Sequence, residues 1–129
     1  MNAIVLLSGG IDSAAGAQFL LKSTNSVSPL FVNYGQPAAS VEGQAAHRLA
    51  LAMGLTLECI KVATSKALGA GEITGRNAFL VMSAVLSKAY TEPCQIALGI
   101  HRGTPYYDCS PAFIQSINRL IAEQSDGRL

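Results

Sequence analysis

The sequence has 129 residues and a formal net charge of +1, with 50% hydrophobic and only 13% charged residues. A chain of this length is expected to fold as a single domain, here residues 1–129. The small net charge gives no electrostatic case for direct binding to nucleic acid or to a membrane surface, and no apolar run approaches the roughly 18 residues of a transmembrane helix.

Predicted strands and helices alternate from the N-terminus onward. The apolar run 3–7 lacks a basic leader and ends before two glycines, which favours a buried strand over a signal sequence. Helical spacing predicts a helix over 13–22, followed by a turn at 25–28 and a second strand at 29–32. A helix is predicted over 40–53, and alternation over 55–62 indicates a strand near the sheet edge.

The same alternation continues in the second half. An apolar helix is predicted over 77–90, a strand over 95–100, and a helix over 111–124 that begins with a proline. This order predicts an α/β fold, a doubly wound parallel sheet of about four to five strands with helices on both faces. The mean hydropathy of +0.33 fits a sheet buried on both faces, or a contact with another chain.

A polar, glycine-containing string separates the first predicted strand from the first predicted helix. It reads Ser8-Gly9-Gly10-Ile11-Asp12-Ser13. The glycines allow a tight turn, and the N–H groups at the helix start face an anion. The Ser8 and Ser13 hydroxyls suit phosphate oxygens, whereas Asp12 suits Mg²⁺ beside a pyrophosphate. The simpler alternative is a strand-to-helix turn in which Asp12 or Ser13 caps the helix.

The string matches the SGGxDS signature and resembles the PP-loop ATP pyrophosphatase family. This resemblance implies a fold like that of the adenine nucleotide alpha hydrolases, with ATP cleaved between its α- and β-phosphates. Neither the Gly-Lys-Ser/Thr of a Walker A loop nor GxGxxG is present.

Three further strings narrow the resemblance. They are 33–36 (NYGQ), 75–77 (GRN) and 107–113 (YDCSPAF), each at a predicted strand end or helix start. Together with residues 8–13 they resemble the 7-cyano-7-deazaguanine synthases, ATP-dependent ligases of queuosine biosynthesis that convert a carboxylate to a nitrile with ammonia. The resemblance implies ATP and Mg²⁺ as cofactors and a small purine-like substrate.

The candidate site residues all lie at one predicted rim of the sheet. The expected catalytic residues are Asp12, which is also the expected Mg²⁺ ligand, and Arg76. The expected nucleotide-binding residues are Ser8, Gly9, Gly10, Asp12, Ser13 and Gly35. The expected substrate-binding residues are Tyr34, Gln36, Arg76, Asn77 and Asp108.

Local structure offers an alternative for most of these side chains. Arg76 is unfavourable at a helix start, which favours an anionic ligand, although a solvated surface arginine is the alternative. Asn77 could cap its helix, and Asp108 could cap the helix that begins at Pro111. Tyr34 could stack on a flat ring or cover the core. His101, just after a strand, could be a general base, but a lone histidine is more often structural or exposed.

The three cysteines, Cys59, Cys94 and Cys109, are odd in number and lack CxxC spacing, which is typical of reduced thiols in a cytoplasmic protein. No histidine is placed by the sequence to activate Cys109, so a bystander thiol is expected there. The synthases also have a cysteine-rich C-terminal zinc site that this sequence does not contain, so no zinc is expected. The chain is therefore expected to need a missing C-terminal segment or to form a homo-oligomer.

The resemblance leaves three functions open. The first is adenylation of 7-carboxy-7-deazaguanine followed by attack of ammonia. The second is the same adenylation of a different acceptor, because the loop 101–108 differs from the usual acidic loop of the synthases. The third is a nucleotide-binding subunit without catalysis.

Overall fold

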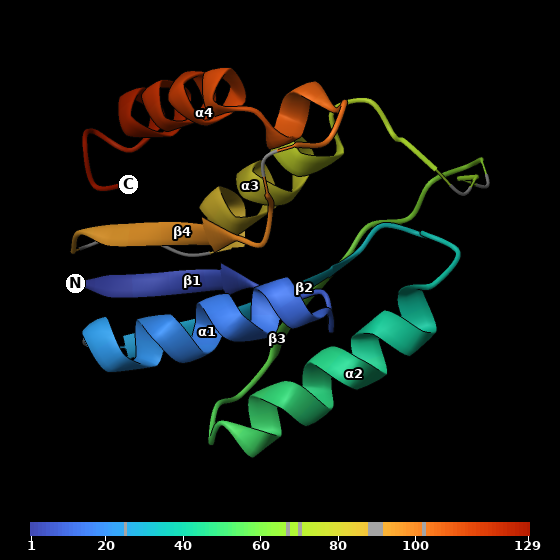
Figure 1. Ribbon diagram of the computed structural model, residues 1–129, viewed down its shortest axis with the longest axis horizontal. Helices are drawn as coiled ribbons and strands as arrows, with labels where there is room; N and C mark the ends of the chain where they lie inside the picture. Colours follow the sequence, from blue (N-terminus) through green and yellow to red (C-terminus); the bar gives the residue numbers. More distant parts are fainter. Residues whose placement is uncertain (25, 67, 70, 88–91, 102) are drawn as a thin grey trace.

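The computed structural model describes residues 1–24, 26–66, 68–69, 71–87, 92–101 and 103–129. Within them, strands and helices alternate as the sequence predicts (Figure 1). The elements in chain order are β1 (Asn2–Leu6), α1 (Ile11–Ser23), β2 (Ser26–Asn33), α2 (Ala39–Ala52), β3 (Glu58–Lys61), α3 (Arg76–Ser87), β4 (Cys94–Leu98), a short 3-10 helix (Tyr107–Cys109) and α4 (Pro111–Gln124).

The strands form one parallel sheet in the order β3-β2-β1-β4. Leu6 of β1 lies opposite Leu30 of β2 and Leu98 of β4, so the three strands are in matched register towards their carboxyl ends. The prediction of a doubly wound α/β fold is confirmed, and so is the edge position of the third strand. None of the helices in the described ranges is long and apolar enough to cross a membrane.

Each face of the sheet is covered by two helices (Figure 1). Ala3, Val5 and Leu7 point towards α1 and α2, where Ala17 and Ala46 are fully buried. Because these helix residues are small, the helices pack close to the strands. On the other face, α3 and α4 pack against β1 and β2. The buried side chains of this cluster are Ile4, Leu6, Leu30, Val32, Val81, Ala84, Phe113, Ile117 and Ile121.

Several predicted boundaries differ from the structure. The turn predicted over 25–28 is wrong for the described residues, because β2 begins at Ser26 and buries Val27. The third strand covers only Glu58–Lys61, since its pairing with β2 starts where Leu30 lies opposite Glu58. The helix predicted over 77–90 begins at Arg76 and is described to Ser87, and residues 88–90 lie outside the described residues. The helix predicted over 111–124 is confirmed.

Candidate functional site

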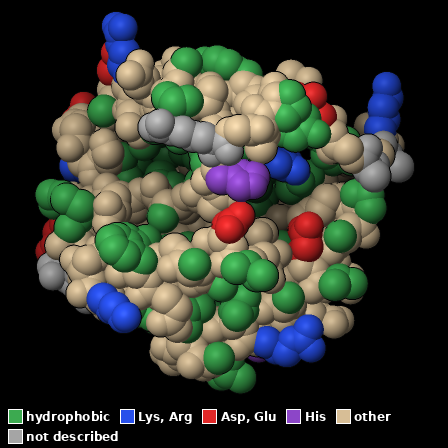
Figure 2. Space-filling view, in the orientation of Figure 1, with side chains coloured by type: hydrophobic (Ala, Val, Ile, Leu, Met, Phe, Trp, Pro, Cys, Tyr) green, Lys and Arg blue, Asp and Glu red, His purple; other side chains and the backbone are tan. Residues whose placement is uncertain are grey.

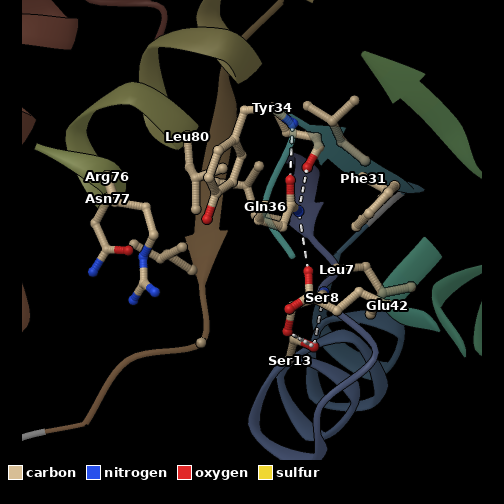
Figure 3. A pocket seen from close by; sticks show the side chains of 15 residues that line it. Leu7, Ser8, Ser13, Phe31, Tyr34, Gln36, Glu42, Arg76, Asn77 and Leu80 are labelled. Atoms are coloured by element: carbon tan, nitrogen blue, oxygen red, sulfur yellow. Dashed lines mark hydrogen bonds between the residues drawn. The ribbon is translucent and has the colours of Figure 1, made fainter. Parts of the chain in front are cut away.

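One pocket lies at the carboxyl ends of β1, β2 and β4, and its volume is about 230 Å³ (Figure 3). The matched register of the strands brings the segments that follow them to the same edge, which is where open α/β sheets bind ligands. Six of the predicted site residues line the pocket, and they come from three separate parts of the chain. These residues are Ser8, Ser13, Tyr34, Gln36, Arg76 and Asn77.

The two glycines after β1 have different structural roles. Gly9 has a φ of +83°, and a Cβ atom there would lie 2.7 Å from the Cβ of Ala45 in α2. Gly9 is therefore required for the loop to turn and to pack against α2. A Cβ on Gly10 would meet only the hydroxyl of Ser8, at an ordinary 3.5 Å, so Gly10 has open space beside it.

Hydrogen bonds between serines hold the loop against the start of α1. Ser13 is 4% exposed, and its Oγ donates to the Gly10 carbonyl over 3.1 Å and accepts from the Ser8 N–H over 3.3 Å. The Ser8 and Ser13 hydroxyls are 3.3 Å apart. The N-cap of α1 is Gly10, and no side chain caps the helix there, so the alternative in which Asp12 or Ser13 is the cap is wrong. The first N–H groups of α1 therefore remain suited to an anion.

The end of β4 completes this side of the pocket through Gly99, which the sequence did not indicate. A Cβ on Gly99 would lie 2.9 Å from the Ser13 nitrogen and 3.2 Å from the Asp12 carbonyl carbon. Only a glycine lets β4 approach the first turn of α1 this closely. The available sequence signal was a glycine inside the predicted strand 95–100, since a glycine in a strand pattern indicates a close approach of another backbone.

The turn after β2 is organised by Gln36, whose side chain is 9% exposed. Its Oε1 accepts from the Tyr34 N–H over 2.9 Å, and its Nε2 donates to the Val32 carbonyl and to Glu42 Oε2 over 3.1 and 3.0 Å. Gly35 adopts a φ of +83°, and a Cβ there would contact Thr64 rather than the pocket. Gly35 is thus needed for the turn, and it does not line the pocket.

Tyr34 projects from this turn and lines the pocket (Figure 3). Its half-buried ring makes an edge-to-face contact with Phe79 of α3, with centroids 5.9 Å apart. Burial raises the pKa of the Tyr34 hydroxyl, and the positive charge of the neighbouring Arg76 guanidinium partly opposes that increase. Tyr34 therefore both covers the start of α3 and lines the pocket together with the cation of Arg76.

Arg76 and Asn77 begin α3, but they differ in burial. Arg76 is exposed and lines the pocket, whereas Asn77 is only 2% exposed. The Asn77 Nδ2 donates to the Asp108 carbonyl over 3.0 Å, and the Asn77 N–H donates to Asp108 Oδ2 over 3.3 Å. Asp108 is therefore held at the N-terminus of α3 and does not line the pocket. The alternative in which Asp108 caps α4 is wrong, because Ser110 accepts from the Phe113 N–H there.

A comparison with protein-family models gives a match over residues 2–78 to the model described as "Queuosine biosynthesis protein QueC". The chain belongs to the QueC family. A comparison with curated proteins found no match. The region that matches the QueC model includes the loop of residues 8–13, the turn that carries Tyr34 and Gln36, and Arg76 with Asn77. Membership places the chain in an ATP-using family of queuosine biosynthesis.

Asp12 and Glu42, the acidic residues that line the hollows beside Ser13, are placed differently in this QueC-family chain. Asp12 is exposed and lines a neighbouring hollow of about 260 Å³ with Ser13, Gly99 and His101, not the main pocket. Glu42, in the first turn of α2, does line the main pocket and was missed by the sequence analysis. The signal for Glu42 was an acidic residue in the first turn of the helix that follows the NYGQ string.

The remaining candidates are peripheral to the pocket. His101 is exposed, and Cys109 is half-buried with its sulfur 3.9 Å from the Asn77 amide. In the described ranges, no group of three or more His, Cys, Asp or Glu side chains is arranged to hold a metal ion. Mg²⁺ that is bound mainly by phosphates needs only one or two protein carboxylates. Asp12 and Glu42 are the acidic residues beside the loop that meet this requirement.

Proposed function

We propose that the chain binds ATP in this pocket and uses it to adenylate the carboxylate of 7-carboxy-7-deazaguanine, which then reacts with ammonia. Pyrophosphate leaves when the carboxylate oxygen attacks the α-phosphate, and AMP leaves when ammonia attacks the activated carbon. A nitrile has no oxygen, so both carboxylate oxygens must depart. The amide formed first therefore requires a second adenylation to give the 7-cyano product.

The observation that carries this proposal is the single pocket shared by the phosphate loop, Tyr34 and Arg76. Ser8, Ser13 and the N–H groups at the start of α1 would hold the phosphates. Arg76 would offset negative charge on the pyrophosphate or on the substrate carboxylate. The ring of Tyr34 offers a flat apolar surface for a purine-like substrate. On this proposal, catalysis consists of positioning and charge stabilisation, with no covalent step by the protein.

Mg²⁺ would accompany the nucleotide beside Asp12. Asp12 is in the first turn of α1, within the 8–13 loop, and it is exposed and lines the neighbouring hollow together with Ser13. The carboxylate of Glu42 already accepts a hydrogen bond from Gln36, so one of its oxygens is engaged. We therefore retain Asp12 as the residue nearest the metal in this proposal.

ATP–pyrophosphate exchange tests the proposal directly. Exchange of labelled pyrophosphate into ATP should require both 7-carboxy-7-deazaguanine and Mg²⁺, and added ammonia should convert the acceptor to the amide and then to the nitrile. Exchange that is supported by another carboxylate but not by this one would indicate an adenylating enzyme with a different acceptor. Calorimetric ATP binding without exchange for any acceptor would indicate a nucleotide-binding subunit.

A further inference from the structure

The hydrogen bonds of Gln36 leave only one possible orientation for its amide. The Tyr34 N–H can only donate, so it must face Oε1, and the Val32 carbonyl can only accept, so it must face Nε2. The second Nε2 proton is directed at the Glu42 carboxylate, 3.0 Å away. Both amide protons are thus engaged within the protein, and neither is available to a ligand.

The three partners of Gln36 belong to different parts of the pocket wall. Val32 is in β2, Tyr34 is in the turn after it, and Glu42 is in the first turn of α2 (Figure 3). Tyr34 in turn reaches α3 through its ring contact with Phe79. One buried side chain therefore connects the α2 side of the pocket, which carries Glu42, to the α3 side, which carries Arg76.

We propose that Gln36 is a positioning residue, which fixes Tyr34 and Glu42 at the pocket wall and acts on ligands only through them. The proposal rests on the ATP site proposed above, and it changes the expected role of Gln36 from substrate contact to support of the residues that make the contact. Buried amides of this kind are costly to disturb, because each lost partner leaves an unsatisfied polar group in the wall.

Gln36→Leu tests the proposal, with Gln18→Leu on the exposed face of α1 as the matched control. Loss of the hydrogen bond to the Tyr34 N–H should free the tyrosine, and the affinity for Mg²⁺–ATP should fall by about tenfold or more. Carbon-13 NMR of labelled tyrosines, assigned with Tyr34→Phe, should show the Tyr34 pKa moving down towards its ordinary value as burial is lost. The control should alter neither quantity.

A second variant covers the case in which Gln36→Leu does not fold. Gln36→Glu places two carboxylates where an amide met a carboxylate, and one pKa of that pair must rise. Protonated Glu can still donate to Glu42, so the affinity for Mg²⁺–ATP should be highest at low pH and fall, relative to wild type, as pH rises through that pKa. The other charged or titratable side chains that line the pocket are Arg76 and Tyr34, and the wild-type profile is the reference that contains their contribution.

The double variant Gln36→Glu with Glu42→Gln restores one donor facing one acceptor. Its pH profile should again run parallel to that of the wild type, whatever its absolute affinity. A Gln36→Glu profile parallel to wild type, or a folded Gln36→Leu variant with an unchanged Tyr34 titration, would overturn the proposal. If the wild type does not bind ATP, the proposed function fails, yet the Tyr34 titration still decides the role of Gln36.

Discussion

The backbones of Gly99 and Ser13 lie so close together that a Cβ atom added to Gly99 would be 2.9 Å from the Ser13 nitrogen. The contact joins the end of β4 to the first turn of α1. Since Gly99 does not have a positive φ, the requirement for glycine comes from space alone. The position of the phosphate loop therefore depends on a residue that is distant from it in sequence.

The first prediction is that Gly99→Ala will displace the start of α1 from β4. All three atoms given within 3.2 Å of the new Cβ are backbone atoms of Asp12 and Ser13, which cannot rotate away. The affinity for Mg²⁺–ATP should fall several-fold, and the melting temperature should fall as well. Isothermal titration calorimetry and thermal unfolding measure the two effects.

Gly16→Ala is the matched control. Gly16 lies in α1, the helix that Gly99 approaches, and a Cβ atom there meets nothing within 4 Å. The substitution should stabilise the protein by about 0.5–1 kcal/mol, since alanine favours the helix and restricts the unfolded chain. Equal effects of the two substitutions would contradict the close-contact argument.

Local patterns and long-range contacts account for what the sequence could and could not predict. The order of elements and the position of the loop depend on hydrophobic periodicity and on glycines adjacent in sequence, and both were predicted. The contacts of Gly99 with Ser13 and of Gly9 with Ala45 require the packed fold. The start of β2 was missed because Pro29 indicated a strand beginning there, whereas pairing with β1 begins at Ser26.

The second prediction concerns the phosphate loop itself. Ser13→Ala removes the hydroxyl that holds the Ser8 N–H and the Gly10 carbonyl, so ATP affinity should fall several-fold with or without Mg²⁺. Asp12→Ala should weaken binding only when Mg²⁺ is present, because its carboxylate acts through the metal. Calorimetric titrations in Mg²⁺ and in EDTA separate the two.

Ser116→Ala, on the exposed face of α4, is the control for loss of a hydroxyl. It should bind ATP like the wild type in both buffers. Unchanged titrations for both Ser13→Ala and Asp12→Ala would rule out nucleotide binding by this loop.

The third prediction is that Arg76 serves ligand binding more than stability. An exposed cation at the N-terminus of α3 opposes the helix dipole, so Arg76→Ala should leave the melting temperature unchanged or slightly higher. Affinity for ATP, or pyrophosphate exchange, should be lost in the same variant. Arg48→Ala, at an exposed position of α2, should change neither, and a large drop in melting temperature with intact binding in Arg76→Ala would show a structural role instead.

The fourth prediction is that Asn77 is a structural residue at the start of α3. Asn77→Ala should lower the free energy of unfolding by about 1–3 kcal/mol, because it leaves the Asp108 carbonyl without its donor. Asn118→Ala, at an exposed position of α4, should stay within about 0.5 kcal/mol of wild type. Denaturant unfolding measures both, and equal stabilities would show that the contact with Asp108 contributes nothing.

The sequence predicted the pocket residues that directly follow a strand or begin a helix. It did not predict roles that depend on contacts between different helices, strands and turns. Ser8, Ser13, Tyr34 and Arg76 follow strands or begin helices, so their convergence on the pocket follows from the parallel sheet. Glu42 reaches the pocket from α2, across the turn, where it accepts a hydrogen bond from Gln36. Whether Asp108 faces a ligand or supports Asn77 depends on the path of the 3-10 helix, which no sequence periodicity indicates.

One edge of the sheet remains open along β4. In the described residues no strand pairs with β4 on the side away from β1, and the Cys94 N–H at its start donates to the Arg128 carbonyl instead. Two hollows of about 260 and 350 Å³ flank this edge, one next to α1 and one next to α4, and both include Ile100 and His101. Figure 2 shows hydrophobic side chains around a hollow on this face of the molecule.

The fifth prediction is that the 129-residue chain self-associates through this edge. An apolar strand whose N–H and carbonyl groups face outwards tends to pair with another chain, and β4 has no lysine or proline to prevent it. A two-fold contact would pair the edges of two copies and cover the flanking hollows. Sedimentation velocity at micromolar concentration should show a dimer. The contact of Cys94 with Arg128 places the N–H groups of alternate residues, Cys94 and Ile96, on the outer side of β4. Ile96→Pro removes an outward N–H without breaking a bond to β1, so it should disrupt the dimer, whereas the control Ile96→Val keeps that N–H and should leave the dimer unchanged. A monomer with a sharp thermal transition would show instead that the edge is protected without a partner.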